Sequence, residues 1–343
     1  MGLKPHYGFV VPHSRSLVDV GSAHPFGTEI EAGFHLLARP DHSLREPLSK
    51  AGVSLMHVNF DYPQVLGSST SVIVFAEPFI NYRGFVLLSL RVGLGASYVS
   101  KVYDENSNPA NLFISSHLSI LTHLDLYLSR YINKNWFIMA YAKYNHISNI
   151  GIKEPNKGLN FPVFGLGAGY TFDPVIFPDV SEQPAWHNLL TLTASLYGSM
   201  YKSEGSDAIK DGKPAIGAMI LAGKRVSRLN GFSLGLEGHA NYRRKQQMEQ
   251  ENLPVDYREL SFLAGHELIL GDFVFSQHWG TYIYAPYYGT DYQDKHFFQR
   301  YSFTYGLTES FTMGMSIRAH GKTALNFNLL LSYEIWKKKK AEK

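Results

Sequence analysis

The chain of 343 residues contains no cysteine, which excludes a disulfide framework and any metal site built on thiolates. Charged residues make up only 18% of the chain, and their signs nearly cancel, leaving a net charge of +3. Bulk charge therefore does not indicate a nucleic acid or another polyanion as partner. No apolar run approaches the roughly 18–20 residues of a membrane-spanning helix.

The two ends of the chain carry no periodic pattern. The first residues, "MGLKPHYGFVVPHSRS", lack the apolar core of a signal peptide. If the protein is exported, we expect this sequence to start at the mature chain. Residues 1–28 contain Pro and His, and we expect an irregular segment that folds over or into the remaining structure. Residues 337–343, "KKKKAEK", are expected to be a solvated basic tail.

The strongest signal is an alternation of apolar with polar or very small residues. Aromatic residues are abundant, with 22 Tyr and 22 Phe, and there are 30 Gly. The alternation is clearest over residues 86–98, 118–128 and 164–172, where the even positions are Val, Leu, Ile, Tyr, Phe, Ala or Thr. Because successive side chains on a strand point to opposite faces, each segment has one apolar face and one polar or tiny face.

A soluble β-sandwich also alternates, but three features favour a membrane barrel. The segments are longer than the usual five or six residues, and long enough to cross a bilayer when tilted. Roughly 14 candidate strands can be counted, and aromatic residues gather near their ends. We therefore predict an all-β fold: one transmembrane antiparallel up-and-down barrel of about 14 strands (12–14), forming a single domain over residues 1–343, in the bacterial outer membrane.

Connection lengths predict the orientation of the barrel. Short links such as 130–135 and 270–272 alternate with long polar links such as 149–161 and 244–257. Outer-membrane barrels have short periplasmic turns and longer external loops. The segment 173–188 is an exception, since the alternation places it on the periplasmic side, where a short turn is expected, and yet it is long.

His146 and Ser148 are the candidate catalytic residues. On the strand predicted from residue 136 they share the apolar, lipid-facing side with Tyr144, and a long external loop follows them. Residues two apart on a strand have Cα atoms about 6.6 Å apart, so an imidazole can reach a hydroxyl. Ionisable groups facing lipid indicate function, and a histidine can activate a serine for attack on an ester. The alternative is a polar strand end that bonds only water and lipid.

The run "HISNIGIKEPNKGL", residues 146–159, resembles the outer-membrane lipid A 3-O-deacylase family (PagL-like), which includes acyloxyacyl hydrolases. The resemblance is concentrated in residues 136–161. It implies a Ser-His-acid triad on the lipid-facing wall of a small barrel, which removes an ester-linked acyl chain from lipid A. Carried over by position, His146 is the general base, Ser148 the nucleophile, Asn156 the oxyanion donor and Asn149 a supporting residue.

The sequence departs from the family in two respects. The usual acid falls on Asn160, whose amide can orient an imidazole but offers no negative charge, and Glu154 is a candidate substitute acid. The chain is also about twice as long as the better-known members. Both departures keep a second reading open, namely a pore, transport or structural barrel that carries a degenerate hydrolase motif.

The expected partners are lipid A or lipopolysaccharide of the outer leaflet and membrane lipid, with no nucleic acid. The oligomeric state stays open, a homodimer included. A serine–histidine mechanism requires no cofactor. His117, His123 and Asp125 alternate on a polar face, and we expect a hydrogen-bond network inside the barrel there rather than a metal site.

Overall fold

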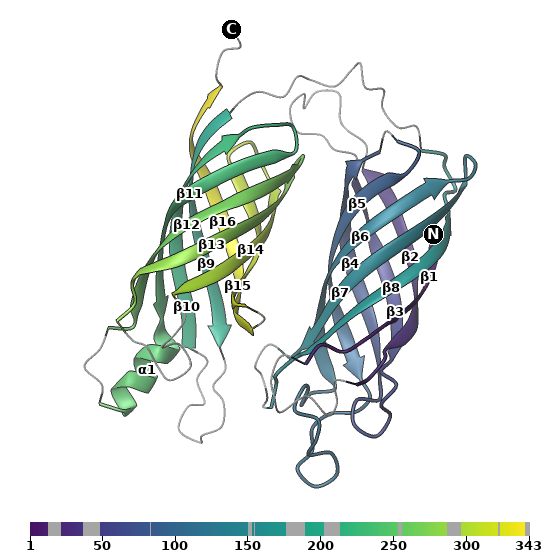
Figure 1. Cartoon of the computed structure of the whole chain (residues 1–343), viewed down its shortest axis with the longest axis horizontal. Helices are drawn as coiled ribbons and strands as arrows, with labels where there is room; N and C mark the ends of the chain where they lie inside the picture. Colours follow the sequence, from purple (N-terminus) through teal and green to yellow (C-terminus); the bar gives the residue numbers. More distant parts are fainter. Residues whose placement is uncertain are drawn as a thin grey trace. The chain divides into compact units, whose positions relative to one another are not determined.

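The computed structural model describes residues 1–12, 22–36, 49–82, 84–149, 153, 155–175, 189–201, 213–252, 256–286, 296–321 and 323–339. Over these residues the chain forms antiparallel strands and one short helix (Figure 1). The strands close into two separate barrels of eight strands each. In the described part of the chain, no helix is long and apolar enough to span a bilayer.

The first barrel contains strands β1 to β8. Their bounds are β1 Gly2–Gly8, β2 Phe26–Leu36, β3 Ser49–Asn59, β4 Ser68–Asn81, β5 Leu87–Val99, β6 Leu118–Tyr131, β7 Trp136–Ser148 and β8 Leu159–Tyr170. Each strand pairs with the next one along the chain, and β1 also pairs with β8, where Gly2 lies opposite Gly169. This last pairing closes the sheet and leaves no open edge.

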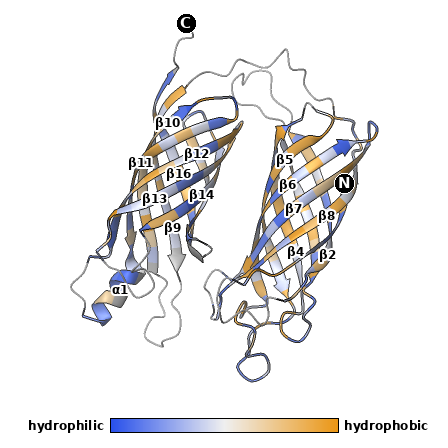
Figure 2. Cartoon of the chain, in the orientation of Figure 1, coloured by the Kyte–Doolittle hydropathy of each residue, from blue (hydrophilic) through white to orange (hydrophobic). Residues whose placement is uncertain are grey.

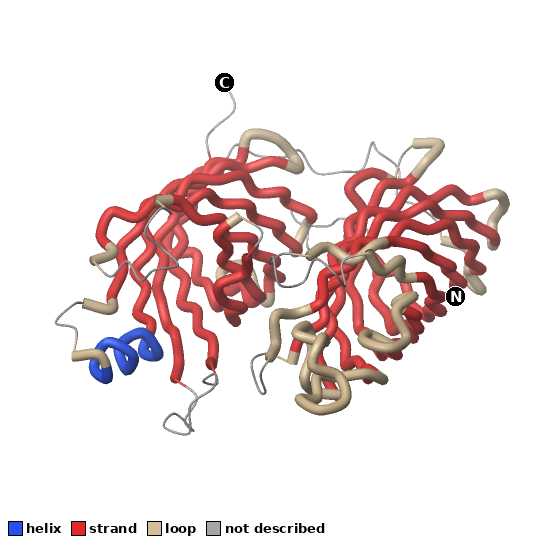
Figure 3. The backbone as a smooth tube through the Cα atoms, turned by 60° about the horizontal axis from the view of Figure 1, so that its bottom comes forward, coloured by secondary structure: helices blue, strands red, loops and turns tan. Residues whose placement is uncertain are grey.

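The second barrel contains strands β9 to β16. Their bounds are β9 Leu189–Tyr201, β10 Lys213–Arg225, β11 Asn230–Asn241, β12 Arg258–Leu270, β13 Phe273–Tyr284, β14 Phe297–Gly306, β15 Phe311–His320 and β16 Thr323–Lys339. Pairing of β16 with β9 closes it. Helix α1, Tyr242–Gln250, follows β11 at one end of this barrel (Figure 3), and its buried Arg244 forms an ion pair with Glu259.

The predicted single barrel of about 14 strands over residues 1–343 is wrong in its number of barrels and strands. The structure instead has two closed barrels, and the chain divides into two compact units. The alternating pattern could not reveal this, because strands of one large barrel and of two small ones alternate in the same way. The exceptional segment 173–188 lies between β8 and β9, so its length reflects the connection from one barrel to the next.

Two predictions about the chain ends are also wrong. Residues 2–8, expected to be irregular, form β1, the strand that completes the first barrel. The basic tail was expected to start at residue 337, but β16 continues through Lys339. Both strands are specified by long-range pairing with β8 and β9, which local periodicity does not register.

The alternation of faces is confirmed in both barrels. Figure 2 shows hydrophobic segments recurring along the strands. Outward positions such as Leu166 and Leu329 are exposed, whereas inward positions such as Arg91 and Glu29 are buried. A barrel of eight strands has an interior that side chains can fill, so neither lumen requires a water channel.

Charged side chains fill the first lumen and compensate one another. The Nζ atom of Lys143 lies 2.5 Å from Glu29 Oε2 and 3.4 Å from Asp125 Oδ2. Asp125 accepts a 2.7 Å hydrogen bond from His123 Nδ1, which is the hydrogen-bond network that the sequence predicted there. His117 lies outside this network, where its Nδ1 contacts the carbonyl of Val99.

The second lumen holds an independent network. Arg300 donates to both carboxylate oxygens of Glu237, at 2.9 and 2.7 Å, and Tyr197 donates to the same group at 2.8 Å. Glu237 and His239 lie on β11 and Glu267 lies on β12, so all three belong to the second barrel and not to the charged interior of the first.

Replacing Arg91 by methionine is expected to destabilise the first barrel strongly. Arg91 is 1% exposed and binds Glu31 at 2.6 Å and Glu77 at 2.9 Å. Its removal leaves buried carboxylates without this cation, which costs about 3–5 kcal/mol. Urea unfolding in lipid vesicles measures the loss. The exposed turn residue Lys134 is the control, since Lys134→Met should change stability by less than about 0.5 kcal/mol; equal effects of the two substitutions would contradict the assignment.

Candidate active site

Strand β7 places His146 and Ser148 on the outer wall of the first barrel. Along this strand Asn145 and Ile147 are buried in the interior, while His146 and Ser148 are half-buried on the opposite face. Across the sheet, His146 lies opposite Thr122 and Ser148 opposite Ile120 of β6. Both side chains therefore lie on the outer face of the strand, as the alternation predicted, and they are two residues apart at its end.

Asn160 of β8 lies directly opposite His146. The Nδ1 atom of His146 lies 2.6 Å from Asn160 Oδ1. Because an amide oxygen only accepts hydrogen bonds, Nδ1 is the protonated nitrogen, and Nε2 carries the lone pair. The backbone of Asn160 is held in turn, since its carbonyl accepts a 2.9 Å hydrogen bond from Val11 N. The amide at the acid position thus fixes both the tautomer and the orientation of the imidazole.

Gly158, just before β8, forms part of the wall around the imidazole. It has a φ of +72°, in the left-handed region that glycine tolerates. A Cβ at this position would lie 2.5 Å from His146 Cε1. Backbone conformation and space therefore both require glycine here.

Asn149 and Asn156 hold the loop that follows β7. The Oδ1 atom of Asn156 accepts a 3.1 Å hydrogen bond from Asn149 N, which orients the Asn156 amide. The buried side chain of Asn149 donates to Lys153 O at 2.6 Å and to Ser115 Oγ at 3.0 Å. Ser115 Oγ donates to the same carbonyl at 2.5 Å. Asn149 therefore ties this loop to the segment that precedes β6.

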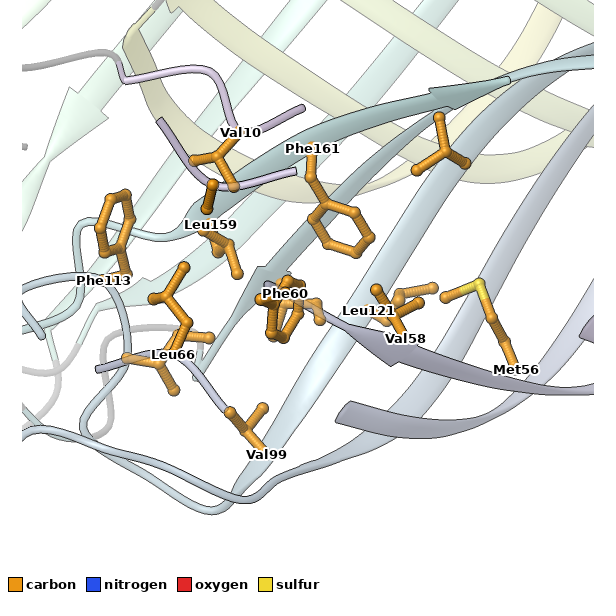
Figure 4. Close-up of a cluster of buried hydrophobic side chains, with 14 of the residues drawn as sticks. Val10, Met56, Val58, Phe60, Leu66, Val99, Phe113, Leu121, Leu159 and Phe161 are labelled. Atoms are coloured by element: carbon orange, nitrogen blue, oxygen red, sulfur yellow. The ribbon is translucent and has the colours of Figure 1, made fainter. Parts of the chain in front are cut away.

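An apolar cluster fills the barrel end beneath the pair (Figure 4). Ile147, Leu159 and Phe161 of β7 and β8 pack there with Phe113 and Val10, and all five are buried. Backbone hydrogen bonds join the same segments, from Lys157 N to Leu112 O and from Gly158 N to Phe113 O. A packed floor of this kind limits movement of the strand ends that carry His146 and Asn160.

The structure brings together most of the residues predicted for the site. His146 and Asn160 are in contact, Ser148 shares their face, and Asn149 and Asn156 bond each other. Glu154, the candidate substitute acid, lies outside the described residues.

Sequence reasoning missed the roles of Gly158 and Ser115. Gly158 belongs to the quoted motif, but its contact with the imidazole depends on the fold of the loop. Ser115 is separated by 34 residues from Asn149, and no local pattern links them. In the described part of the chain, no group of three or more His, Cys, Asp or Glu side chains has the arrangement of a metal site.

Comparison with known proteins divides the chain at the same place as the fold. The family model described as "Lipid A 3-O-deacylase (PagL)" matches residues 27–169, within the first barrel. The model described as "Acyloxyacyl hydrolase, C-terminal domain" matches residues 190–338, within the second. A search of curated proteins found no match.

Two kinds of solved structure show limited likeness. The crystal structure of the outer membrane enzyme PagL is 14% identical, covers 51% of this chain and 100% of its own, and has a TM-score of 0.36. A mutant of Rh. blastica porin is 7% identical, covers 97% of this chain and 99% of its own, and has a TM-score of 0.21. These likenesses are too low to support an argument about function.

Proposed function

Because the chain belongs to the lipid A 3-O-deacylase (PagL) family, we propose that it is an outer-membrane serine esterase that removes an ester-linked acyl chain from lipid A. The observation that carries the proposal is the hydrogen bond from His146 to Asn160 on the outer wall, beside Ser148. It gives the imidazole the tautomer that a general base needs.

The reaction begins when Ser148 Oγ attacks the ester carbonyl carbon and Nε2 of His146 takes the hydroxyl proton. The carbonyl oxygen becomes an oxyanion, and the Asn156 amide, oriented by its bond from Asn149 N, is the proposed donor to it. The intermediate then expels the sugar alkoxide, which receives the proton from Nε2. An acyl ester on Ser148 remains.

Water completes the cycle. Nε2 takes a proton from a water molecule, the resulting hydroxide attacks the acyl carbon, and Ser148 leaves with the proton. The products are a free fatty acid and a lipid with one acyl chain fewer. Asn160 holds the imidazole throughout, although its amide stabilises the imidazolium less than a carboxylate would.

The position of the pair defines how substrate approaches. His146 and Ser148 end a strand whose outer face is apolar, and the long loop that follows marks the external side. The acyl chain can therefore stay in the membrane while its ester reaches Ser148 at headgroup depth. Lipopolysaccharide of the outer leaflet fits this approach.

A pore is the less favoured function. In the described residues, buried ion pairs and aromatic side chains occupy both interiors, among them Arg91, Tyr127 and Arg300. An eight-stranded barrel filled in this way has no room for solute passage.

Mass spectrometry of lipid A from cells with and without the protein tests the proposal. The expected result is the loss of one ester-linked acyl chain when the protein is present, restored when Ser148 is replaced by alanine. Lipid A of identical mass under all three conditions would contradict the proposed activity.

Replacing Gly158 by alanine is expected to lower the rate of fatty-acid release by about 100-fold, because the new Cβ displaces the imidazole and small misplacements of catalytic groups have effects of this size. The control is Gly321→Ala. Gly321 also has a positive φ, of +59°, but a Cβ there meets nothing within 4 Å. A rate for Gly158→Ala as high as that for Gly321→Ala would contradict the expected displacement of His146.

A further inference from the structure

The outer wall of the second barrel carries an apolar groove of about 820 Å³. Its walls include the exposed side chains of Leu196, Ile216, Leu329 and Leu331. They come from β9, β10 and β16, which are hydrogen-bonded neighbours in the closed sheet. The volume falls within the range of about 300–1,000 Å³ that is usual for sites that bind small molecules.

Small outward residues hollow the wall between these side chains. Ala218 of β10 pairs with Gly238 of β11, and Gly198 of β9 pairs with Ile216, the neighbouring outward position of β10. A Cβ at Gly238 would meet no atom within 4 Å, and one at Gly198 would come no closer than 3.6 Å. Neither glycine has a positive φ. The barrel itself therefore does not require glycine at these positions, and their effect is to keep the groove open.

We propose that this groove binds an acyl chain of lipid A, at a site separate from Ser148. The outer wall of a membrane barrel faces hydrocarbon, so an apolar groove there is filled by a lipid chain. The groove reaches the external end, since Gly238 is near the end of β11 and Gly198 near the end of β9, and both strands lead into long connections. From there it extends across the sheet to Met313, near the start of β15. The end of the groove at Gly198 and Gly238 is at the depth of the outer leaflet.

Arg258 supports the choice of a phosphate-bearing lipid. It belongs to the groove lining and is the first residue of β12, and its side chain is 69% exposed. Its Nε and Nη2 atoms donate to Asp256, and these hydrogen bonds hold the pKa of Asp256 at about 2. A guanidinium has five N–H donors, so the exposed group can also bind a headgroup phosphate.

In this role the second barrel holds lipid A in the membrane, and binding requires no hydrolysis. The binding of a lipid chain is inferred from the groove itself, and only the choice of lipid A as that lipid rests on the proposed function. For this reason the test uses the full chain with Ser148 replaced by alanine, so that the absence of lipid binding and the absence of esterase activity are distinguished.

Photolabelling in vesicles tests the inference. The probe is phosphatidylglycerol with a diazirine on its acyl chain, and mass spectrometry locates the labelled residues. Labels should concentrate on Leu196, Ile216 and Leu331, compared with outer-wall residues such as Ile283. An excess of lipid A should lower the labelling of the groove about tenfold, which corresponds to about 1.4 kcal/mol of preference.

Variants that fill the groove sharpen the test. Ala218→Leu combined with Gly238→Leu should abolish the concentrated labelling, whereas Ala222→Leu with Ala264→Leu, on exposed outer positions outside the groove, should not. Arg258→Gln should weaken competition by lipid A. Even labelling around the barrel, or labelling that lipid A does not reduce, would overturn the inference. It is also overturned if filling the groove changes the oligomeric state and leaves labelling unchanged, because the groove would then bind a second copy.

Discussion

Purified Ser148→Ala protein will release fatty acid from lipopolysaccharide at least about 10³-fold more slowly than the wild type, because the nucleophile is lost. His146→Ala should reduce the rate to a similar extent, since without the base the serine hydroxyl is a poor nucleophile. The double variant should be no slower than either single variant, because residues that act as a unit have non-additive effects. Mass spectrometry of the released acid measures all three rates.

The same barrel offers a matched control for this prediction. His57 Nδ1 lies 2.9 Å from Thr70 Oγ1, on exposed outer positions of β3 and β4. This second imidazole and hydroxyl pair lacks the asparagine and the loop that surround His146. His57→Ala and Thr70→Val should each alter the rate by less than about twofold, or about 0.4 kcal/mol. If either change greatly slows fatty-acid release while Ser148→Ala stays active, the reaction takes place at His57 and Thr70. That result would contradict the assignment of the active site to Ser148.

Substitutions of Asn160 should change the rate in opposite directions. Asn160→Leu removes the acceptor for Nδ1–H, and loss of the correct tautomer lowers the rate by about 10²–10⁴-fold. Asn160→Asp keeps the acceptor and adds the negative charge that stabilises an imidazolium, which should raise the rate about tenfold, or about 1.4 kcal/mol in the barrier. Both effects should appear in kcat more than in KM, because the charge on the imidazole develops only during the reaction.

Two outcomes would contradict this role. If Asn160→Leu retains the full rate, the hydrogen bond to His146 has no catalytic importance. If Asn160→Asp and Asn160→Leu are equally slow, the amide itself is required, and the comparison with a Ser-His-acid triad does not describe this site.

The strands and their faces could be predicted from sequence because they depend on local alternation. His146 and Ser148 were placed on the lipid side by counting even positions along one segment, and the structure has the same facing. The pairing of His146 with Asn160 followed from the family resemblance, and the register of β7 and β8 sets these residues opposite each other.

The number of barrels could not be predicted in this way, because closure depends on which distant strands meet. The pairing of Gly2 with Gly169 joins residues that are 167 positions apart, and nothing near either one indicates the partner. The segment 173–188 was the one signal of a second barrel in the sequence, because it is a long link on the side where the other links are short. The contacts of Ser115 with Asn149 are hidden for the same reason.

The most direct test of an activated serine on the lipid-facing wall is reaction with an alkyl fluorophosphonate, in which the serine oxygen displaces fluoride. Digestion and mass spectrometry locate the adduct. We expect a single adduct on Ser148, formed about 100-fold more slowly in His146→Ala because the general base is removed. Absence of an adduct on Ser148, or equally fast labelling without His146, would contradict this expectation.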